Sequence, residues 1–254
     1  HQLILEGPDG DRPVDMPIDV LLGKPPRMTR DGRRAARDLP GIDAVGLELK
    51  VVAAGVLRLP AVANKSFLIT IGDRTVGGLC SRDQMVGPWQ VPVADCAIGL
   101  RDYEGYLGEA LSLGERTPLA VIDAAASARM AIAEAVTIIA AAPIDGIGRI
   151  KLSANWMAAC GDAAEDADLF DAVKAAADLS IALGISIPVG KDSLSMRTVW
   201  RDGAQDKRVT APVSLIATGC APVTDARRAL TPQLRNDVDS VLILIDLGQG
   251  RQRL

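Results

Sequence analysis

The sequence predicts an α+β fold, and three observations support this prediction. Two long alanine-rich stretches, 117–142 and 162–183, have the apolar spacing of amphipathic α-helices. Runs rich in β-branched residues, such as 149–157 and 209–219, lie around them and indicate strands. Of the 254 residues, 48% are hydrophobic but only 3% are aromatic. A sizeable core is therefore expected, built from closely packed Ala, Val, Leu and Ile.

Charge and residue usage exclude several classes of function. The net charge of −4 argues against a nucleic-acid partner. No stretch approaches the roughly 18 to 20 uninterrupted apolar residues of a membrane span. The four cysteines form no CxxC pair, which is typical of reduced thiols in a cytoplasmic protein. The only histidine is His1, so Ser-His-Asp, Cys-His and His-rich metal sites are excluded within the chain, and hard, oxygen-bound metals remain.

Both ends of the chain read as incomplete units. Residues 14–22 resemble an edge strand, because Pro17 excludes a central position, and no second strand is recognised for it to pair with. The basic, proline-rich residues 23–30 are interpreted as a linker. At the other end, 241–248 resembles a buried strand with nothing after it to complete a sheet. We therefore expect a compact core over 33–220.

The next segments predict a helix and a hairpin. Residues 33–59 have helix-like spacing and end at Pro60. Residues 66–78 contain β-branched runs around a Gly-Asp turn, which predicts a β-hairpin. Lys65, just before this hairpin, would ordinarily be a solvated lysine.

A polar loop and a short strand follow. Residues 81–90 form a loop with a Gly-Pro break, and 91–94 read as a strand that stops at Asp95. An acidic residue at a strand end is well placed to bind a metal. It is also an ordinary turn residue, and the residues alone favour the turn.

The clearest helix begins at 117. Thr117 suits the N-cap and Pro118 the first helical position, and Pro143 ends the helix. Glu134 shares one helix face with apolar residues four positions apart, including Ile138. A carboxylate in such a stripe is costly unless it is neutralised. A bound cation or a nearby Lys or Arg would both do this.

A second strand-to-helix unit follows. Residues 149–157 predict a strand entering a polar loop. Asp162 is expected to cap the next helix, and Glu165 three residues later resembles a capping box. Gly184 has the position of a glycine that ends a helix.

The stretch 184–196 joins a short apolar strand to a polar sequence, Gly190-Lys191-Asp192-Ser193. A glycine turn beside a lysine suits a phosphate or a carboxylate, and a plain polar turn between strands fits equally well. The stretch is not a Walker A loop, because its glycine spacing differs and Asp192 follows the lysine.

Several long motifs resemble those of one family, the large bacterial phosphoribosylformylglycinamidine synthase. The matching segments are 19–24, 68–74, 82–94, 151–157, 188–193 and 231–234. This resemblance implies a mixed, largely antiparallel sheet with helices packed on one face. The resemblance further implies that this arrangement is the N-terminal half of an aminoimidazole-ribonucleotide-synthetase-like module. It also implies three parts: 1–32 ending a preceding half-module, 33–220 as the N-terminal half of the second module, and 221–254 beginning the next half-module.

The resemblance implies a ligase of de novo purine synthesis. Such enzymes use ATP and glutamine to convert formylglycinamide ribonucleotide (FGAR) to formylglycinamidine ribonucleotide. The implied partners are the rest of the synthetase and its glutaminase domain, whereas nucleic acid and membrane are not expected. An internal fragment is expected to be inactive alone. Because family half-modules share a barrel-like sheet, the fragment is also expected to self-associate.

Site residues are carried over by matching positions. The resemblance implies ATP or ADP at Lys65 and Ala94, with Mg²⁺ at Asp95 and Glu134. This chain departs from the family at Ile138, where the family has an asparagine ligand and an isoleucine has no donor. Weak or absent nucleotide binding is therefore expected for the fragment.

The resemblance implies that the glycine-lysine stretch, residues 190–193, is a signature motif of the family. Gly190 and Ser193 are expected to bind nucleotide. Catalytic candidates are Lys191, Asp192 and Gln84. The stretch is expected to form one wall of a site whose other walls belong to the first module.

Overall fold

The computed structural model of the chain describes residues 1–24, 27–36, 39–41, 43–72, 74, 78–236, 239–246 and 250. It divides into two units, His1–Asp31 and Gly32–Leu254. Each unit is considered by itself.

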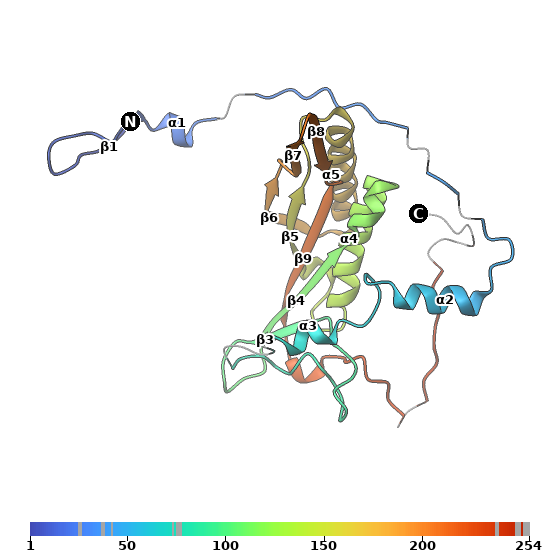
Figure 1. The fold of residues 1–254 in the computed structure, drawn as a ribbon. Helices are drawn as coiled ribbons and strands as arrows, with labels where there is room; N and C mark the ends of the chain where they lie inside the picture. The colour runs from blue at the N-terminus through green and yellow to red at the C-terminus, as the bar shows by residue number, and fades with distance from the viewer. Residues whose placement is uncertain are drawn as a thin grey trace. The chain divides into compact units, whose positions relative to one another are not determined.

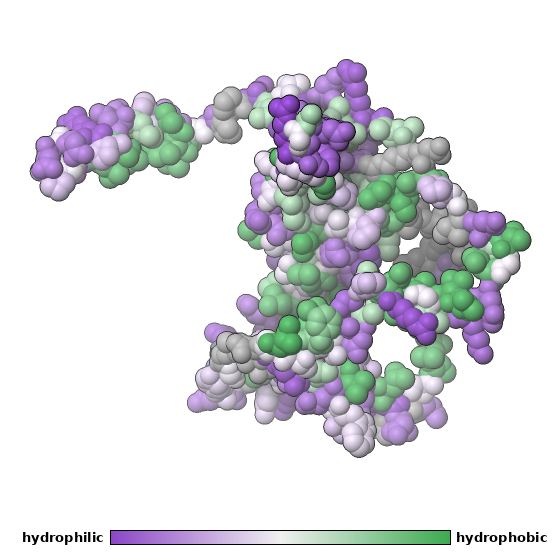
Figure 2. All heavy atoms as spheres, in the orientation of Figure 1, coloured by the Kyte–Doolittle hydropathy of each residue, from purple (hydrophilic) through white to green (hydrophobic). Residues whose placement is uncertain are grey.

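The first unit is a hairpin followed by one helical turn. Strand β1 (Gln2–Leu5) pairs antiparallel with β2 (Val14–Pro17), and α1 covers Asp19–Leu22. The predicted unpaired strand over 14–22 is therefore wrong in two ways. It has a partner in the Gln-Leu-Ile-Leu run of β1, and its second half is helical. The unit buries little hydrophobic side-chain surface. Figure 2 shows hydrophobic surface on the part that includes α1, where Leu22 is 80% exposed.

The second unit is built on a five-stranded sheet. Its strands are β3 (Ala97–Leu100), β4 (Gly108–Glu115), β9 (Ser214–Val223), β5 (Lys151–Met157) and β6 (Ser186–Ser193), in the order β3-β4-β9-β5-β6. All neighbours are antiparallel except β5 and β6, which are parallel. A parallel pair needs a crossover, and helix α5 (Ala163–Leu183) supplies it.

Two helices pack on one face of this sheet. Helix α4 (Ala124–Ile139) lies against β4 and β9 and packs beside α5, as Figure 1 shows. The predicted mixed, largely antiparallel sheet with helices on one face is confirmed. Small residues form the contact, since Ala131, Ala135 and Ala217 are almost fully buried. An alanine core of this kind brings backbones close together.

Smaller elements complete the unit. They are α2 (Leu49–Arg58), α3 (Ser66–Thr70), three 3₁₀ turns (Thr117–Val121, Ile147–Arg149 and Ala226–Arg228) and the hairpin of β7 (Arg197–Asp202) with β8 (Gln205–Thr210). Gly203, with φ of 60°, makes the hairpin turn in the left-handed region that glycine favours.

Several predicted elements before the sheet differ from the structure. The helix expected over 33–59 is present only in α2, and residues 37, 38 and 42 lie outside the described residues. The hairpin expected over 66–78 begins as helix α3, because Asn64 Oδ1 accepts a hydrogen bond from Ser66 N and turns the chain. Positions 73 and 75–77 of that hairpin lie outside the described residues. The strand expected over 91–94 is reduced to one bridge, Met85 to Val93.

The long helix expected from Thr117 is divided. Residues Thr117–Val121 form a 3₁₀ turn with Pro118 in its first turn. The α-helix starts after Asp123, whose Oδ1 accepts from Ala126 N at 2.7 Å. Thr117 was wrongly expected to be the cap, because its hydroxyl donates to Glu115 Oε2 instead. The predicted boundaries of α5 are confirmed, since Asp162 caps its start and Gly184, with φ of 67°, ends it.

The C-terminal strands also differ from the prediction. The single strand expected over 209–219 is the end of β8 and the start of β9. The buried strand expected over 241–248 is exposed and irregular over 241–246, where Leu242 and Leu244 are each 93% exposed. Positions 247 and 248 lie outside the described residues.

Candidate functional site

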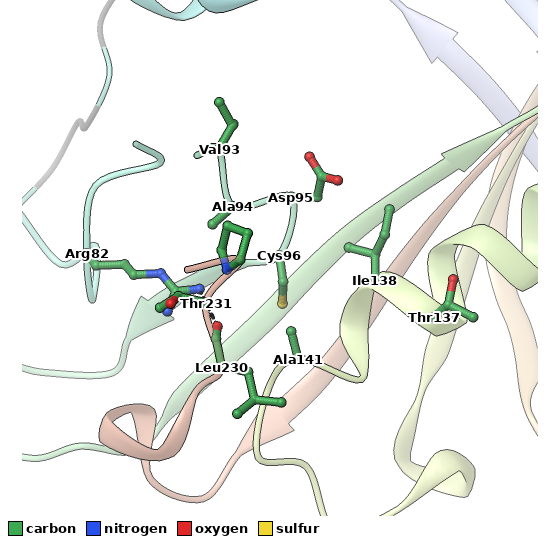
Figure 3. Close-up of a pocket in the computed structure, with 11 residues that line it drawn as sticks. Arg82, Val93, Ala94, Asp95, Cys96, Thr137, Ile138, Ala141, Leu230 and Thr231 are labelled. Carbon is green, nitrogen blue, oxygen red and sulfur yellow. Dashed lines mark hydrogen bonds between the residues drawn. The ribbon is translucent and has the colours of Figure 1, made fainter. Parts of the chain in front are cut away.

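A pocket of about 260 Å³ lies between the loop before β3 and the C-terminal half of α4. Figure 3 shows its lining from three parts of the second unit. The loop contributes Arg82, Val93, Ala94, Asp95 and Cys96, the helix contributes Thr137 and Ile138, the turn after the helix contributes Ala141, and the segment after β9 contributes Leu230, Thr231 and Pro232. This volume suits a small group or one part of a larger ligand.

The pocket combines charges of both signs with an apolar wall. Asp95 lies beside Ile138, and Arg82 lies across the pocket near Leu230. Arg82 Nη2 donates to Leu230 O at 3.0 Å, which ties the segment after β9 to the loop. Cys96 is buried, and burial raises the pKa of its thiol although Arg82 opposes the shift. The thiol is therefore a poor nucleophile, and the arginine is the group suited to an anion.

A smaller hollow of about 80 Å³ shares Arg82, Ala94 and Cys96 with this pocket. Asp83 lines it and accepts hydrogen bonds from Met85 N at 2.9 Å and Arg74 Nη2 at 2.7 Å. These bonds hold the pKa of Asp83 below its usual range. Asp83 is thus an ionised group whose Oδ1 accepts both bonds, and its lowered pKa does not suit a general base.

Gln84 contributes through its backbone. Its carbonyl accepts a hydrogen bond from Ala94 N at 2.7 Å. The 82–96 loop is therefore folded back on itself, with Gln84 and Ala94 brought together in the smaller hollow. The resemblance implies different roles for them, catalysis for Gln84 and nucleotide binding for Ala94, and the structure brings the two residues to one surface.

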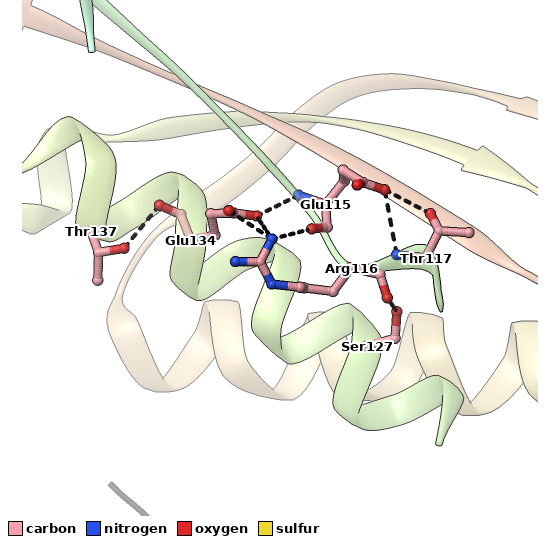
Figure 4. A network of polar contacts seen from close by, with 6 residues as sticks. All are labelled: Glu115, Arg116, Thr117, Ser127, Glu134 and Thr137. Carbon is pink, nitrogen blue, oxygen red and sulfur yellow. Dashed lines mark hydrogen bonds and ion pairs between the residues drawn. The ribbon is translucent and has the colours of Figure 1, made fainter. Parts of the chain in front are cut away.

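Glu134 lies at the centre of a polar network on α4 (Figure 4). Its Oε2 accepts from Glu115 N at 2.9 Å and from Arg116 Nη1 at 2.8 Å, and Oε1 lies 2.7 Å from the same Nη1. Of the two partners left open by the sequence, a bound cation or a nearby basic residue, this structure has the basic residue. No sequence signal marked Arg116, which precedes Glu134 by 18 positions.

Gly114 makes this network possible. A Cβ atom at Gly114 would lie 2.0 Å from Ala131 O and 2.7 Å from Ala135 N. Only a glycine lets β4 approach the backbone of α4 so closely. The buried Ser112 hydroxyl donates to Ala135 O at 2.7 Å beside this contact. The end of β4 is therefore held where Glu115 N reaches Glu134.

The two candidate metal ligands face different surroundings. Asp95 lines the pocket, whereas Glu134 is outside its lining and is engaged by Arg116. Among the described residues, no group of three or more His, Cys, Asp or Glu is arranged to hold a metal ion. Magnesium is often bound by one or two carboxylates together with phosphates and water. Asp95 is the one of the two carboxylates that lines the pocket, Glu134 is paired with Arg116, and Ile138 adds no ligand.

The glycine-lysine stretch is a strand rather than a turn. Residues 190–193 continue β6, and Gly190 pairs with Ala154 of β5. A Cβ at Gly190 would lie 2.0 Å from Ala154 O, so this glycine serves close strand packing. The glycine turn expected to expose N–H groups is therefore wrong. Lys191 and Asp192 are exposed on β6, and Ser193 is half-buried.

Lys65 lies apart from the pocket lining. Its Nζ donates to Ala63 O at 2.6 Å and to Pro60 O. The ammonium thus closes the turn before α3 with two of its three N–H donors.

A family model, described as the FGAR-AT PurM_N-like domain, matches residues 64–222. This match includes the sheet, both packed helices and most of the pocket. The chain belongs to this family. The FGAR-AT PurM_N-like match begins at residue 64 and ends within β9.

Solved structures share the fold of this FGAR-AT PurM_N-like chain. A chain in the structure of PurLQS from Thermotoga maritima is 17% identical, with a TM-score of 0.55, and the match covers 89% of this chain and 32% of that one. T. maritima PurL complexed with FGAR is 17% identical, with a TM-score of 0.54, covering 88% and 31%. T. maritima PurL complexed with ATP is 18% identical, with a TM-score of 0.52, covering 88% and 32%. The chain spans about a third of the length of these proteins.

No described helix is long and apolar enough to cross a membrane.

Proposed function

We propose that the chain is a synthetase part of an FGAR amidotransferase, which makes formylglycinamidine ribonucleotide from FGAR, ATP and glutamine. The observation that carries this proposal is the family match over 64–222. The same fold occurs in T. maritima PurL complexed with ATP, with ADP and with FGAR. The reaction depends on placing phosphates and cations rather than on a histidine nucleophile, and the only histidine here is His1.

In this proposal the pocket beside α4 takes part of a nucleotide. Arg82 supplies a positive charge, and Ala94 supplies its backbone polar groups. The apolar wall at Ile138 and Ala141 suits the face of a nucleoside. A magnesium ion held through Asp95 and Glu134 would neutralise the phosphates when bound. Lys65 is proposed as a second phosphate partner, since its two carbonyl acceptors use two of its three N–H donors.

The β6 stretch belongs to a second surface in this proposal. Lys191 and Asp192 are exposed on the strand, so they are available to substrate or to another module. Gly190 and Ser193 would assist nucleotide binding there through the backbone, and Gln84 stays a catalytic candidate from the smaller hollow. The rest of the synthetase and a glutaminase domain are the proposed partners.

Calorimetry with ADP and with ATP, each with and without Mg²⁺, tests the nucleotide part of the proposal. Binding that weakens in Arg82→Met but not in the matched variant Arg197→Met would support the pocket. Equal binding by both variants would contradict it. Formation of formylglycinamidine ribonucleotide is measured separately with FGAR, ATP and glutamine. The chain alone is expected to form none, and activity in the chain alone would contradict the proposed need for partners.

A further inference from the structure

The smaller hollow beside the pocket, of about 80 Å³, is lined by two arginines and one acid. Arg74 comes from the segment after α3, whereas Arg82 and Asp83 come from the loop before β3. Asp83 is ionised at neutral pH, because hydrogen bonds from Met85 N and from Arg74 hold its pKa below the usual range. Two positive groups and one negative group leave an excess of positive charge, which favours an anion.

Arg74 has a hydrogen-bond donor that the described chain does not use. Its Nη2 donates to Asp83 Oδ1 at 2.7 Å and contacts Gln90 Oε1 at 3.4 Å. Its Nε is buried and has no hydrogen-bond acceptor among the described residues. A buried donor without an acceptor is costly, so such a group in a folded protein calls for an explanation. An oxygen atom that enters the hollow would supply the acceptor.

The charge of Arg82 is not balanced by an acid in the part of the chain that the structure describes. Its Nη2 donates to the neutral carbonyl Leu230 O at 3.0 Å. Asp83, the acid in the hollow, is engaged elsewhere, since its Oδ1 accepts from Arg74 Nη2 and from Met85 N at 2.9 Å. A guanidinium with a neutral partner keeps its attraction for an anion.

Backbone hydrogen bonds hold the walls of the hollow in place. Ser81 N donates to Ile98 O at 2.9 Å, and Ala94 N donates to Gln84 O at 2.7 Å. The hollow is therefore formed by the chain itself, and little ordering is needed when a ligand enters. Its volume suits one small group and is too small for a whole nucleotide.

We propose that this hollow is an oxyanion site that takes one phosphoryl group, with Arg74 and Arg82 as its two cationic donors. A phosphoryl group has enough oxygens to accept from two guanidinium groups at once, and such charge-assisted bonds are the strong ones. Arg74 Nε donates to one of these oxygens while Nη2 keeps its bond to Asp83. The site goes beyond the proposed nucleotide pocket, because Arg74 lines the hollow and is absent from the pocket lining.

NMR of the arginine Nε–H groups in the isotope-labelled full chain tests this site directly. Inorganic phosphate should shift the Arg74 Nε–H signal until the site is saturated, whereas sodium chloride of equal ionic strength should not. Arg74→Lys identifies the signal. It keeps a positive charge beside Asp83 but has no Nε donor, so it should weaken phosphate binding, followed at the Arg82 signal, by roughly tenfold or more.

Arg34→Lys is the matched control for Arg74→Lys. It also keeps a positive charge beside an aspartate and removes an Nε donor, since Arg34 Nε donates to Asp171 at 2.7 Å, and Arg34 does not line the hollow. It should leave phosphate binding unchanged. Weaker binding in Arg74→Lys alone supports the site. An Arg74 signal that phosphate leaves in place, or that chloride shifts equally, overturns it without the use of any variant.

Two further outcomes separate the hollow from the pocket. Phosphate binding of equal strength in Arg74→Lys and the unmodified chain overturns the site, because Arg82 would then hold the anion in the pocket. Titration with ADP identifies the source of the phosphoryl group. An Arg74 shift with ADP supports the site and assigns it to a nucleotide phosphate. A shift with phosphate in a chain that binds no ADP also supports the site, assigns it to free phosphate, and contradicts the proposed nucleotide pocket.

Discussion

At the scale of single residues, charge pairs attach the start of the second unit to helix α5. Arg33 N donates a hydrogen bond to Ala163 O at 2.8 Å. The Arg34 guanidinium donates two hydrogen bonds to the Asp171 carboxylate, at 2.6 and 2.7 Å. Such bidentate pairs combine charge with directionality. The hydrogen bond and charge of Arg34 lower the pKa of Asp171, so this attachment depends on pH.

The sign of that dependence follows from the direction of the shift. Because the folded pKa is lowered, the pair stabilises the fold fully above the ordinary carboxyl value of about 3.9, and this contribution is lost as the pH falls through the folded pKa. In urea unfolding, Asp171→Asn should be less stable than the chain from pH 5.5 to 8, with a difference that shrinks below about pH 4. Arg34→Met should remove this pH-dependent difference. A difference that persists unchanged in the Arg34→Met background would contradict the pairing.

Cysteine reactivity is a second residue-level prediction. Cys96 is buried and its thiol pKa is raised by burial, whereas Cys80 is exposed. The thiolate is the reactive form, so iodoacetamide at pH 8 should modify Cys80 at least several-fold faster than Cys96. Peptide mass spectrometry over time measures both rates in one sample. Equal rates would show that the loop carrying Cys96 opens in solution.

The residue scale also shows where sequence reasoning reaches its limit. Glu134 stands out because a carboxylate in an apolar helix stripe needs a partner, and it has one. That partner could not be identified, since Arg116 becomes its neighbour only when β4 packs along α4. Asp95 was placed at a strand end, and the structure places it at a pocket edge after an irregular loop. Spacing along the chain predicts local neighbours, but not those created by packing.

At the scale of elements, the close contact of β4 with α4 supports the site. The Cβ added by Gly114→Ala would overlap Ala131 O. This is a backbone atom, so it cannot move away as the end of a flexible side chain could. Overpacking of this kind typically costs about 1–3 kcal/mol of unfolding free energy. It should also separate Glu115 N from Glu134. Gly99→Ala on β3 is the matched control, because nothing lies within 4 Å of its added Cβ.

Urea unfolding of the two alanine variants measures this difference. Gly114→Ala should show a lower midpoint with an unchanged slope, and Gly99→Ala should stay near the unmodified chain. Two variants of equal stability would mean that the strand does not approach the helix so closely in solution.

Element boundaries were predictable where a local signal decides them. The Asp162 cap and the Gly184 stop of α5 depend on neighbours within one or two turns, and both predictions are confirmed. The strand at Gly190 was interpreted as a turn because glycine and polar residues usually mark turns. Here the glycine makes room for Ala154 O across the parallel pair, which is a tertiary requirement without a local signal. The same applies to α3, where β-branched residues fold as a helix behind Asn64.

At the scale of the whole second unit, the sheet has one covered face and one open face. Alternate residues of β4 face the helices and are buried, whereas Leu111 and Leu113 on the other face are 45% and 54% exposed. Val189 on β6 is 62% exposed, and Ile216 on β9 is half-buried. An antiparallel sheet can leave one face to water, but that face is then usually polar. Glu109, Glu115 and Lys151 also lie on this open face, so only part of it is apolar. That apolar part is proposed to pack against another copy of the same fold.

Light scattering of the chain over a concentration series tests this packing. The chain is expected to self-associate at high concentration, and Leu113→Arg should shift it to the monomer, because a charge would be buried in the contact. Leu57→Arg is the matched control, since Leu57 is exposed on α2, outside the sheet. A strictly monomeric chain would contradict self-association. A dimer that survives Leu113→Arg but not Leu57→Arg would move the contact from the sheet to α2. Loss of the dimer in Leu113→Arg but not in Leu57→Arg would support self-association through the open face of the sheet.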